Sequence, residues 1–400
     1  MRKVSVFFLT LVSLIVQAQH PPLGLWRGVM HYEQADVPFV FSLTEEGEKL
    51  VVNIINGREN ERLGYANIKK DSIVVPFDVF DAGLEARYTQ DSMVGVWIKH
   101  YREVPIAFSA TYGRPRFERS KSLKDPVQID QKWQITFEPD QAIAYRGVGL
   151  WHQQGDQVRG TIMAEVSDFR FFEGIVTSDS IKVSSFDGAH AFLVEGRREE
   201  KGWRGIIHFD NNYSEPWTAV ASDDASLKDP WQMQQVDRGK YRPFFDLLAA
   251  GSGKDAIDES DYFGKVLVIQ LFGTWCPNSL DATKYLSEWY RKQDPNQVSI
   301  LGVAYEPNYS RAYGLSRIAS YKNALDIPYD LILGGRLSKG QAAVAFTFMH
   351  KIEAFPTLVI IDKQGYVRYV HSYFNGPATG KHYDEFAASF DSRVNELLAE

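Results

Sequence analysis

One short segment of the chain combines a nucleophile with a position that could activate it. Cys276 is the only cysteine among the 400 residues. It follows the apolar run Val266 to Phe272 (VLVIQLF) and precedes Pro277, beyond which apolar residues recur at helical spacing. Because proline is favoured in the first turn of a helix, this pattern predicts that Cys276 lies at a helix N-terminus. Free backbone N–H groups and the helix dipole stabilise a thiolate there, so we expect a lowered thiol pKa and an exposed sulfur.

The alternative interpretation of Cys276 is a buried structural residue, since free cysteine is among the side chains most often buried. Its Trp-Cys-Pro context at a junction between strand and helix favours the reactive interpretation. A single cysteine cannot form a disulfide within its own chain. Any covalent redox chemistry must therefore involve a second molecule.

The elements that would position Cys276 alternate between strand and helix. Val266 to Phe272 has the length and continuous apolar character of a central parallel strand that is buried on both faces. Further strands are expected at 298–305, around 329–333, at 358–361 and at 367–370, and helices near 310–324, 338–350 and 383–398. Such alternation predicts an α/β sheet, with a hairpin turn at 363–365.

The N-terminal half, from about Pro21 to Pro230, has a different pattern. Short apolar or alternating runs separated by Gly, Asp and Asn are typical of a β-sandwich or barrel. This region also repeats itself, since 47–73 aligns without gaps on 155–181. The matching residues are Gly47 with Gly155, Arg62 with Arg170, Asp71-Ser72-Ile73 with Asp179-Ser180-Ile181, and Phe77-Asp78 with Phe186-Asp187. We therefore predict two β units, 19–126 and 127–232, that pack as a pair.

The repeated module has two interpretations. Arg62 and Arg170 are candidate anchors of a docking surface for a partner or ligand. The interpretation that we favour is a scaffold, because repeated Gly and Asp most often serve turns. The tryptophans of this half are expected in the core: Trp26, Trp97, Trp151, Trp203 and Trp217. Its histidines show no short metal-ligand spacing, so we expect neither a metal nor another cofactor.

Composition and the first residues indicate an exported protein. The formal net charge is −7 without a basic stripe, which argues against a nucleic-acid partner. Residues 1–18 have the basic start, short apolar run and small-residue cleavage pattern of a signal peptide. An uncleaved N-terminal anchor is the alternative, although this run is shorter than the ~20 residues of a membrane-spanning helix. We expect no membrane span after signal removal and a location in the periplasm or cell envelope.

Two segments carry a family resemblance. GKVLVIQLFGTWCPNS, followed later by EAFPTLVIIDKQGYV, resembles the TlpA/ResA-like branch of the thioredoxin superfamily, which shares features with AhpC/TSA-type domains. Members of this branch are exported thiol-disulfide oxidoreductases. The resemblance spans 241–400 and implies a multi-domain chain, in which an all-β tandem repeat module precedes an α/β thioredoxin fold.

The resemblance also implies site residues. The catalytic set would be Cys276, Ser279 and Pro356, with Pro356 in a cis peptide bond facing the sulfur. Residues expected to contact an extended substrate are Trp275, Pro277, Asn278, Phe355 and Thr357. A buried polar group behind the cysteine would correspond to Gln270. Because the neutral Gln270 is a weak proton carrier, Glu306 and Glu353 are the candidate carboxylates for that role, but we favour solvated surface charges for both.

The chain departs from the family pattern at one position of its motif. Ser279 stands where the family carries the second cysteine of C-x-x-C, and a serine hydroxyl cannot resolve a mixed disulfide. The favoured function is therefore a monothiol oxidoreductase acting on protein or small-molecule thiols and disulfides, with an external resolving thiol. The alternatives are a redox-inactive thioredoxin-fold binding module and a one-cysteine peroxidase, although Thr274 does not match the Thr-x-x-Cys spacing of peroxiredoxins.

Overall fold

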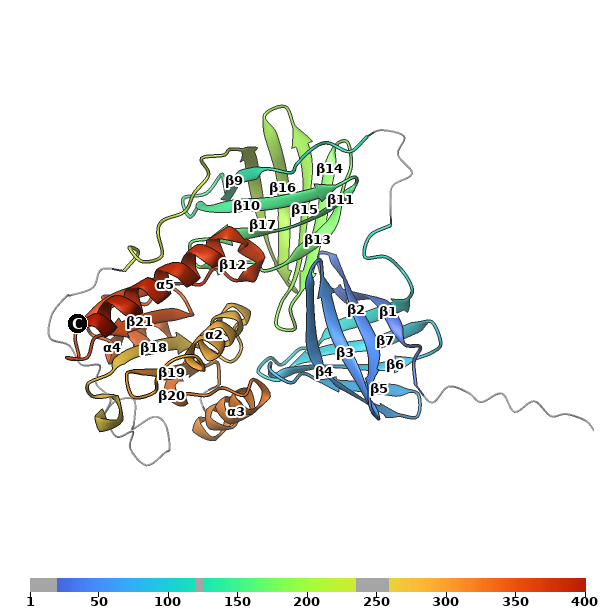
Figure 1. The fold of residues 1–400 in the computed structure, drawn as a ribbon. Coiled ribbons are helices and arrows are strands. Elements are labelled where there is room, and N and C mark those ends of the chain that lie inside the picture. The colour runs from blue at the N-terminus through green and yellow to red at the C-terminus, as the bar shows by residue number, and fades with distance from the viewer. Residues whose placement is uncertain (1–19, 119–124, 235–258, 309) are drawn as a thin grey trace, which may run out of the picture.

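The computed structural model describes residues 20–118, 125–234, 259–308 and 310–400. It consists of two β barrels and a C-terminal α/β domain, and each of these units contacts the other two (Figure 1). The predicted multi-domain architecture is confirmed, and of the two β architectures considered the barrel is the one observed. The predicted signal peptide at 1–18 and the start of the predicted C-terminal domain lie outside the described residues.

The first barrel contains eight antiparallel strands in chain order, closed by pairing of the first strand with the last. Its strands are β1 (Gly24–His31), β2 (Asp36–Glu46), β3 (Lys49–Asn56), β4 (Glu59–Lys69), β5 (Ser72–Pro76), β6 (Ala82–Tyr88), β7 (Ser92–Lys99) and β8 (Ile106–Tyr112). Alternate residues of these strands point inward and form one apolar core.

The second barrel repeats this arrangement. Its strands are β9 (Lys132–Phe137), β10 (Tyr145–Gln154), β11 (Gln157–Ala164), β12 (Ser167–Asp168), β13 (Phe172–Val176), β14 (Ser180–Phe186), β15 (Ala191–Glu199), β16 (Gly202–Asp210) and β17 (Tyr213–Ala221). Pairing of β9 with β17 and of β10 with β11 closes the ring, and the short strand β12 pairs only with β11.

The sequence repeat corresponds to equivalent places in the two barrels. Gly47 and Gly155 occupy the β2–β3 and β10–β11 turns, and both have φ of 62°, a conformation that favours glycine. All five tryptophans predicted for the core are buried. The barrels share part of their packing, because Phe186 at the end of β14 enters the core of the first barrel, with ring centroids 4.5 Å from Phe39 and 5.2 Å from Trp97.

The C-terminal domain is a five-stranded sheet in the order β20-β19-β18-β21-β22. Its elements are η1 (Glu259–Tyr262), β18 (Val266–Phe272), α2 (Pro277–Tyr290), β19 (Val298–Glu306), α3 (Arg311–Ala324), β20 (Asp330–Arg336), α4 (Lys339–Ala345), β21 (Thr357–Ile361), β22 (Val367–Ser372), η2 (Pro377–Thr379) and α5 (Lys381–Ala399). As predicted, β18 is central and buried on both faces, parallel to β19 and antiparallel to β21.

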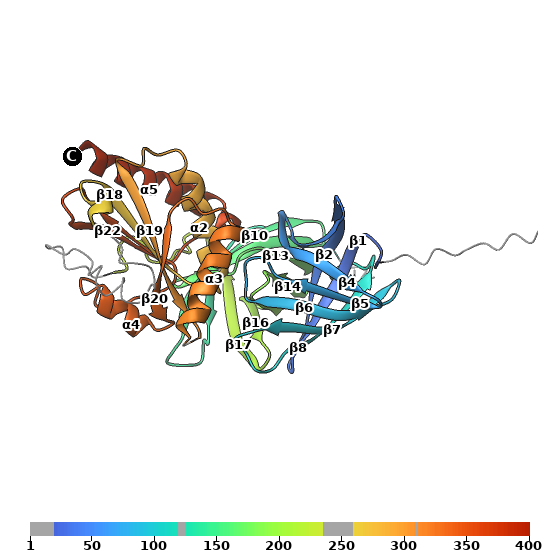
Figure 2. The same cartoon turned by 90° about the horizontal axis from the view of Figure 1, so that it is seen from below.

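The two faces of this sheet are covered by different helices. One face packs against α2, α3 and α5, and the other against α4 and η1. Helices α2 and α3 lie on the side toward the barrels, whereas α4 lies on the far side (Figures 1 and 2). The helix predicted at 338–350 is shorter than expected. It ends at Ala345 because Phe346, Phe348 and Met349 are buried in a non-helical segment beneath the sheet.

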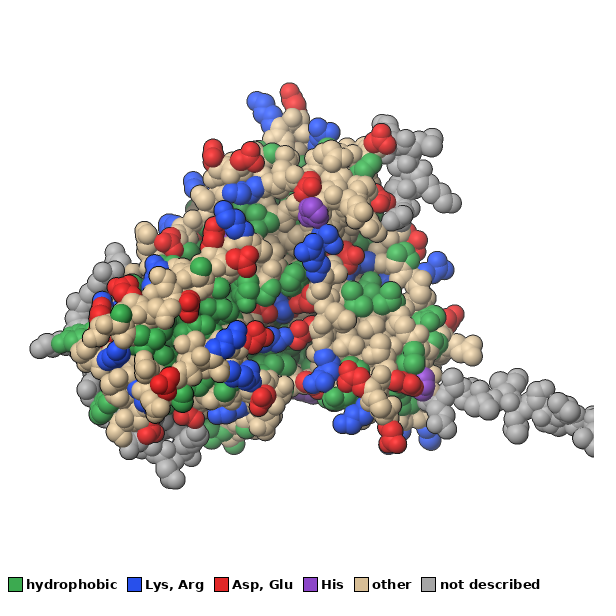
Figure 3. Space-filling view, viewed as in Figure 1, with side chains coloured by type: hydrophobic (Ala, Val, Ile, Leu, Met, Phe, Trp, Pro, Cys, Tyr) green, Lys and Arg blue, Asp and Glu red, His purple; other side chains and the backbone are tan. Residues whose placement is uncertain are grey.

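None of the helices in the described part of the chain is long and apolar enough to cross a membrane. Figure 3 shows acidic and basic side chains intermixed over the face that it displays, rather than a continuous field of one sign.

Candidate active site at the domain junction

Cys276 lies between the C-terminal end of β18 and the first residue of α2. It is the N-cap residue of α2, with extended backbone and Pro277 in the first turn, as the sequence predicts. Its thiol donates a hydrogen bond to the carbonyl oxygen of Phe355, at 3.7 Å. The Phe355–Pro356 peptide bond is cis, so the predicted X-cis-Pro segment does face the sulfur.

The expected exposure and lowered pKa of Cys276 are wrong. The residue is only 7% exposed, and burial raises the pKa of its thiol. The hydroxyl and backbone N–H of Ser279 and the backbone N–H of Asn278 oppose this rise, while the Asp187 carboxylate adds to it. The helix N-terminus therefore acts on the thiol as predicted, but desolvation has the larger effect in this closed arrangement.

The second barrel binds the motif itself. The Asn278 side-chain amide donates to the Asp168 carboxylate at 2.7 Å and to the Asp168 carbonyl at 3.0 Å. The same carboxylate accepts from the Gly376 N–H at 3.2 Å, close to the start of η2. Burial raises the pKa of Asp168 to about 6, although the Gly376 hydrogen bond and Arg170 oppose the rise. Asp168 thus holds the first turn of α2 and the loop before η2 against the second barrel.

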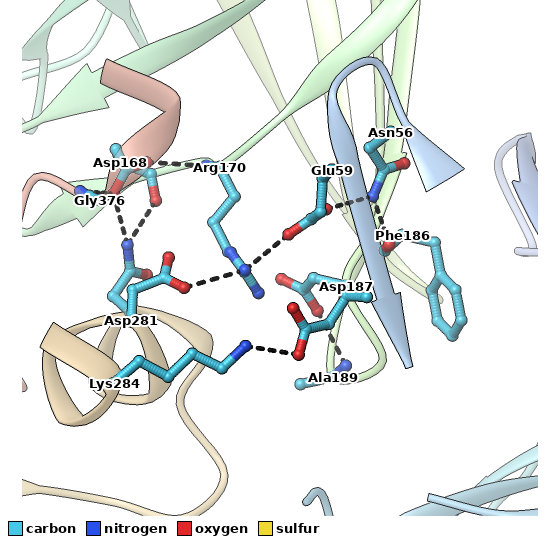
Figure 4. A network of polar contacts seen from close by, with 12 residues as sticks. Asn56, Glu59, Asp168, Arg170, Phe186, Asp187, Ala189, Asp281, Lys284 and Gly376 are labelled. Atoms are coloured by element: carbon cyan, nitrogen blue, oxygen red, sulfur yellow. Dashed lines mark hydrogen bonds and ion pairs between the residues drawn. The ribbon is translucent and has the colours of Figure 1, made fainter. Parts of the chain in front are cut away.

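A buried ion-pair network joins all three units (Figure 4). Arg170 of the second barrel donates to Glu59 of the first barrel at 2.7 Å and to Asp281 of α2 at 3.0 Å. These carboxylates raise the pKa of Arg170, although burial alone would lower it. Burial raises the pKa of Asp281 to about 7 despite the neighbouring Arg170. Lys284, one turn further along α2, adds an ion pair of 2.5 Å with Glu61 of β4.

A cavity of about 530 Å³ lies between the second barrel and the C-terminal domain, with Cys276 in its wall. The C-terminal domain contributes Trp275, Cys276, Pro277, Asn278, Leu337, Ser338, Lys339, Ala354 and Phe355. The second barrel contributes Val166, Ser167, Asp168, Phe169, Arg170, Asp187, His190, Phe192 and Phe209. Five of the eight predicted site residues therefore line one cavity, and half of its wall comes from the repeat module.

Three predicted site residues, Ser279, Pro356 and Thr357, do not line this cavity. Ser279 is fully buried, and its hydroxyl meets no acceptor with good geometry among the described residues. Pro356 is buried behind Phe355. Thr357 is also buried, and its hydroxyl donates to the Ala354 carbonyl at 2.8 Å. Trp275 is fixed by donation from its indole N–H to the Tyr305 carbonyl at 2.9 Å.

The polar groups behind the site differ from expectation in one respect. Gln270 is buried between β18 and α2, as predicted, where it donates to Thr283 at 2.9 Å. The interpretation of Glu306 as a solvated charge is wrong, because this side chain is 1% exposed. It accepts from the N–H and the hydroxyl of Thr274, both at 2.9 Å, and burial raises its pKa to about 7. Glu353 is partly exposed and pairs with Lys351 at 2.8 Å.

Comparison with known proteins agrees with this geometry. The AhpC/TSA family matches residues 239–370. Over 143 residues the chain is 26% identical to the thiol:disulfide interchange protein DsbE of Vibrio cholerae, covering 36% of this chain and 69% of that protein. The C-terminal domain therefore has a thioredoxin-like fold and is similar to thiol-disulfide oxidoreductases.

Solved structures similar to the thioredoxin-fold domain include a thiol-disulfide isomerase from Corynebacterium glutamicum. It is 15% identical, with a TM-score of 0.29, over 45% of this chain and 99% of that one. A secreted disulfide oxidoreductase of Mycobacterium tuberculosis, described as homologous to DsbE, is also 15% identical. Its TM-score is 0.25, over 33% of this chain and 87% of that one.

Sequence reasoning missed the contribution of the second barrel to the site. Arg62 and Arg170 were equivalent candidates, but Arg62 pairs with Asp78 at 2.8 Å on the surface of the first barrel. Only Arg170 reaches the thioredoxin-fold domain. The repeat alignment contained a usable signal, because it places an arginine and an aspartate at matching positions in both repeats. These are Arg62 and Asp78 in the first repeat and Arg170 and Asp187 in the second. The aromatic residues that face Cys276 gave no signal of their own.

Proposed function

We propose that this protein is an exported monothiol oxidoreductase that acts through mixed disulfides at Cys276. The observation that carries the proposal is the pairing of the Cys276 sulfur with the Phe355 carbonyl in front of cis-Pro356. This geometry places an exchangeable sulfur beside backbone that can pair with a bound substrate. The periplasm or cell envelope is the compartment that we assign, from the sequence pattern of residues 1–18.

The exchange proceeds in two balanced steps. The Cys276 sulfur attacks one sulfur of a disulfide R–S–S–R, forming Cys276–S–S–R while the S–S bond of the substrate breaks. The displaced RS⁻ takes up a proton equivalent to the one lost by Cys276. An external thiol R′–SH then attacks the mixed disulfide, releases R–S–S–R′ and regenerates the Cys276 thiol. No electrons are left over, since each step exchanges one disulfide for another.

The neighbouring residues have distinct roles in this proposal. Ser279 places a hydroxyl near the sulfur, where it opposes the burial-driven rise of the thiol pKa but provides no second thiol. Trp275, Pro277, Asn278 and Phe355 line the space in which a disulfide would be attacked. For Pro356 and Thr357 we propose an indirect effect, since they shape the segment that carries the Phe355 carbonyl.

A redox-inactive binding module is the second candidate function. The burial of Cys276 and its raised pKa favour it, because both slow attack by the sulfur. This alternative predicts that Cys276→Ser leaves partner binding and cellular function unchanged. A one-cysteine peroxidase has less support, since the Thr274 hydroxyl is directed to Glu306 rather than to the sulfur.

Trapping of the first intermediate tests the proposal. Mature protein is incubated with glutathione disulfide, and its intact mass is measured before and after addition of excess thiol. We expect one glutathione adduct at Cys276 that excess thiol removes, and none in Cys276→Ser. Absence of an adduct under conditions that modify free cysteine would favour the binding module.

A further inference from the structure

We infer that the cavity between the second barrel and the thioredoxin-fold domain is a binding site for a compact, largely apolar thiol or disulfide with one hydrogen-bond acceptor. The inference rests on the proposed function and specifies its substrate class. According to this inference, the second barrel forms half of the substrate site. If the barrel were only a scaffold, it would take no part in binding a substrate near Cys276.

The wall of the cavity is predominantly aromatic and apolar. Phe169, Phe192 and Phe209 come from the second barrel, facing Trp275 and Phe355 of the other domain. Phe169 and Phe192 contact each other edge to face, with ring centroids 5.4 Å apart, and Phe209 lies 6.4 Å from Phe192. Aromatic walls of this kind contribute binding free energy mainly to apolar or aromatic ligands.

Most charged groups in the wall are already engaged by the protein. The Asp168 carboxylate accepts from Asn278, Gly376 and the Arg170 N–H. One carboxylate oxygen of Asp187 accepts from the N–H groups of Ala189 and His190 at 2.8 and 2.6 Å. A highly charged ligand would therefore have to compete with existing contacts.

One buried donor remains for a ligand. Arg170 is 4% exposed, and its Nε lacks a partner in the described part of the chain. A buried donor without an acceptor is costly, so this group favours a ligand that carries an acceptor. His190 pairs through Nδ1 with Asp187 at 3.5 Å and stacks on Phe192, but its side chain is 35% exposed and solvent can satisfy the rest of its ring.

The dimensions of the site favour small ligands. A cavity of about 530 Å³ is within the range of small-molecule sites. Cys276 is 7% exposed at its wall, and the Asp168 and Arg170 contacts hold the barrel beside it. A compact molecule fits within this space, whereas a folded protein would have to insert its disulfide between the two domains.

Relative rates of exchange test the inference. Mixed-disulfide formation at Cys276 is followed with dithiodipyridine, glutathione disulfide and insulin, and each rate is divided by that of N-acetylcysteine with the same probe. Dithiodipyridine is compact and aromatic and carries a ring-nitrogen acceptor. We expect its normalised rate to exceed the other two by about tenfold or more, the effect of a well-fitted apolar contact.

Variants of the barrel wall provide the matched comparison. Phe209→Ala enlarges the cavity and is expected to reduce the preference for dithiodipyridine, while Phe209→Trp fills it and is expected to slow exchange with that probe. Ile206→Ala on the same strand is the control, because Ile206 is 45% exposed and lies outside the cavity wall. One Phe209 change enlarges the cavity and the other reduces it. A general loss of folding would therefore not reproduce both effects.

The outcomes separate this inference from the proposed function. Equal normalised rates for all probes, faster exchange with insulin, or unchanged selectivity in both Phe209 variants would overturn the inference and leave exchange at Cys276 intact. Failure of every probe to modify Cys276 would overturn the proposed function and the inference together.

Discussion

The Asn278 amide donates a 2.7 Å hydrogen bond to the Asp168 carboxylate, so a residue of the C-x-x-S motif is held by the second barrel. Asp168 also binds the Gly376 N–H, and its neighbour Arg170 binds Asp281 of α2. The motif, the loop before η2 and the barrel consequently form one interface. Access to Cys276 depends on that interface as well as on the thioredoxin-fold domain itself.

Removal of the Asp168 carboxylate is expected to expose Cys276. Asp168→Ala deletes hydrogen bonds that join the domains, and loss of hydrogen bonds to a charged group costs about 1.5–3 kcal/mol. The fraction of molecules in which the second barrel has moved away from Cys276 should rise by about tenfold or more. The rate of iodoacetamide modification of Cys276 should rise with it. Asp224→Ala is the control, since Asp224 is exposed in the segment after the second barrel. Equal rates in the two variants would show that Asp168 does not limit access.

The pH dependence of Cys276 alkylation follows from its burial. Burial raises the pKa of the thiol, so the thiolate fraction at neutral pH is smaller than that of free cysteine. We expect a slow reaction near pH 7 and a rate that still increases at pH values where N-acetylcysteine has reached its plateau. Rates measured from about pH 6 to 10 provide the comparison. A plateau at lower pH than that of N-acetylcysteine would contradict the raised pKa.

Arg170 and Arg62 offer a matched test of the interdomain network. Arg170→Met leaves Glu59 and Asp281 buried without their ion-pair partner, which is expected to destabilise the protein by about 3–5 kcal/mol. Arg62→Met removes the equivalent, partly exposed pair with Asp78, for which about 1 kcal/mol or less is expected. Urea unfolding followed by tryptophan fluorescence measures both variants. Similar unfolding midpoints for the two would refute a structural role specific to Arg170.

Restoration of a second thiol should change the reaction. In Ser279→Cys the new sulfur occupies a fully buried position one turn from Cys276 at the start of α2. We expect the new thiol to attack a mixed disulfide on Cys276, which breaks the Cys276–S–S–R bond, forms an intramolecular disulfide and releases R–SH without added thiol. Intact-protein mass spectrometry detects both. Persistence of the mixed disulfide in this variant would contradict the assignment of Ser279 as the missing resolving position.

His371 makes the stability of the thioredoxin-fold domain dependent on pH. Its ring is 2% exposed and packs on Trp231 and Phe386, and burial lowers its pKa from 6.5 to about 3. Between these values the unfolded chain binds a proton that the folded chain excludes. The folded state should therefore lose up to about 1.4 kcal/mol for each pH unit below 6.5.

The variant His371→Phe should flatten this dependence, because it removes the proton-binding group while keeping an aromatic ring in the aromatic cluster. His152→Phe is the control, since the side chain of His152 is 61% exposed. Thermal unfolding of both variants from about pH 4 to 7 tests the prediction. If stability depended on pH equally steeply in His371→Phe and in the unmodified protein, His371 would be excluded as the source of that dependence.

Local patterns predicted much of the fold. The continuous apolar run of β18 and Pro277 at the start of α2 are short-range signals, and both elements occur where the sequence placed them. The turns at Gly47 and Gly155 are also local, because each requires a positive φ. Helix α4 was overpredicted, since buried apolar residues at 346–349 resemble a helix in sequence but pack without forming one.

The environment of the candidate site depends on contacts that sequence patterns do not encode. Cys276 is buried beside the second barrel, where Asp168 binds Asn278 across 110 positions of sequence. Glu306 is buried because its strand end lies beneath the Thr274 loop. Both effects oppose the local expectation for an N-cap cysteine and a charged side chain. The motif therefore predicted which residue could react, while the interdomain packing determines how accessible it is.

The most direct test of the account is the rate at which the Cys276 mixed disulfide is released. Protein carrying one glutathione adduct is isolated, and release is followed with increasing external thiol. Because no second cysteine exists, we predict a stable adduct without thiol and a release rate proportional to thiol concentration. Release without added thiol, or an adduct that excess thiol does not remove, would contradict resolution by an external thiol.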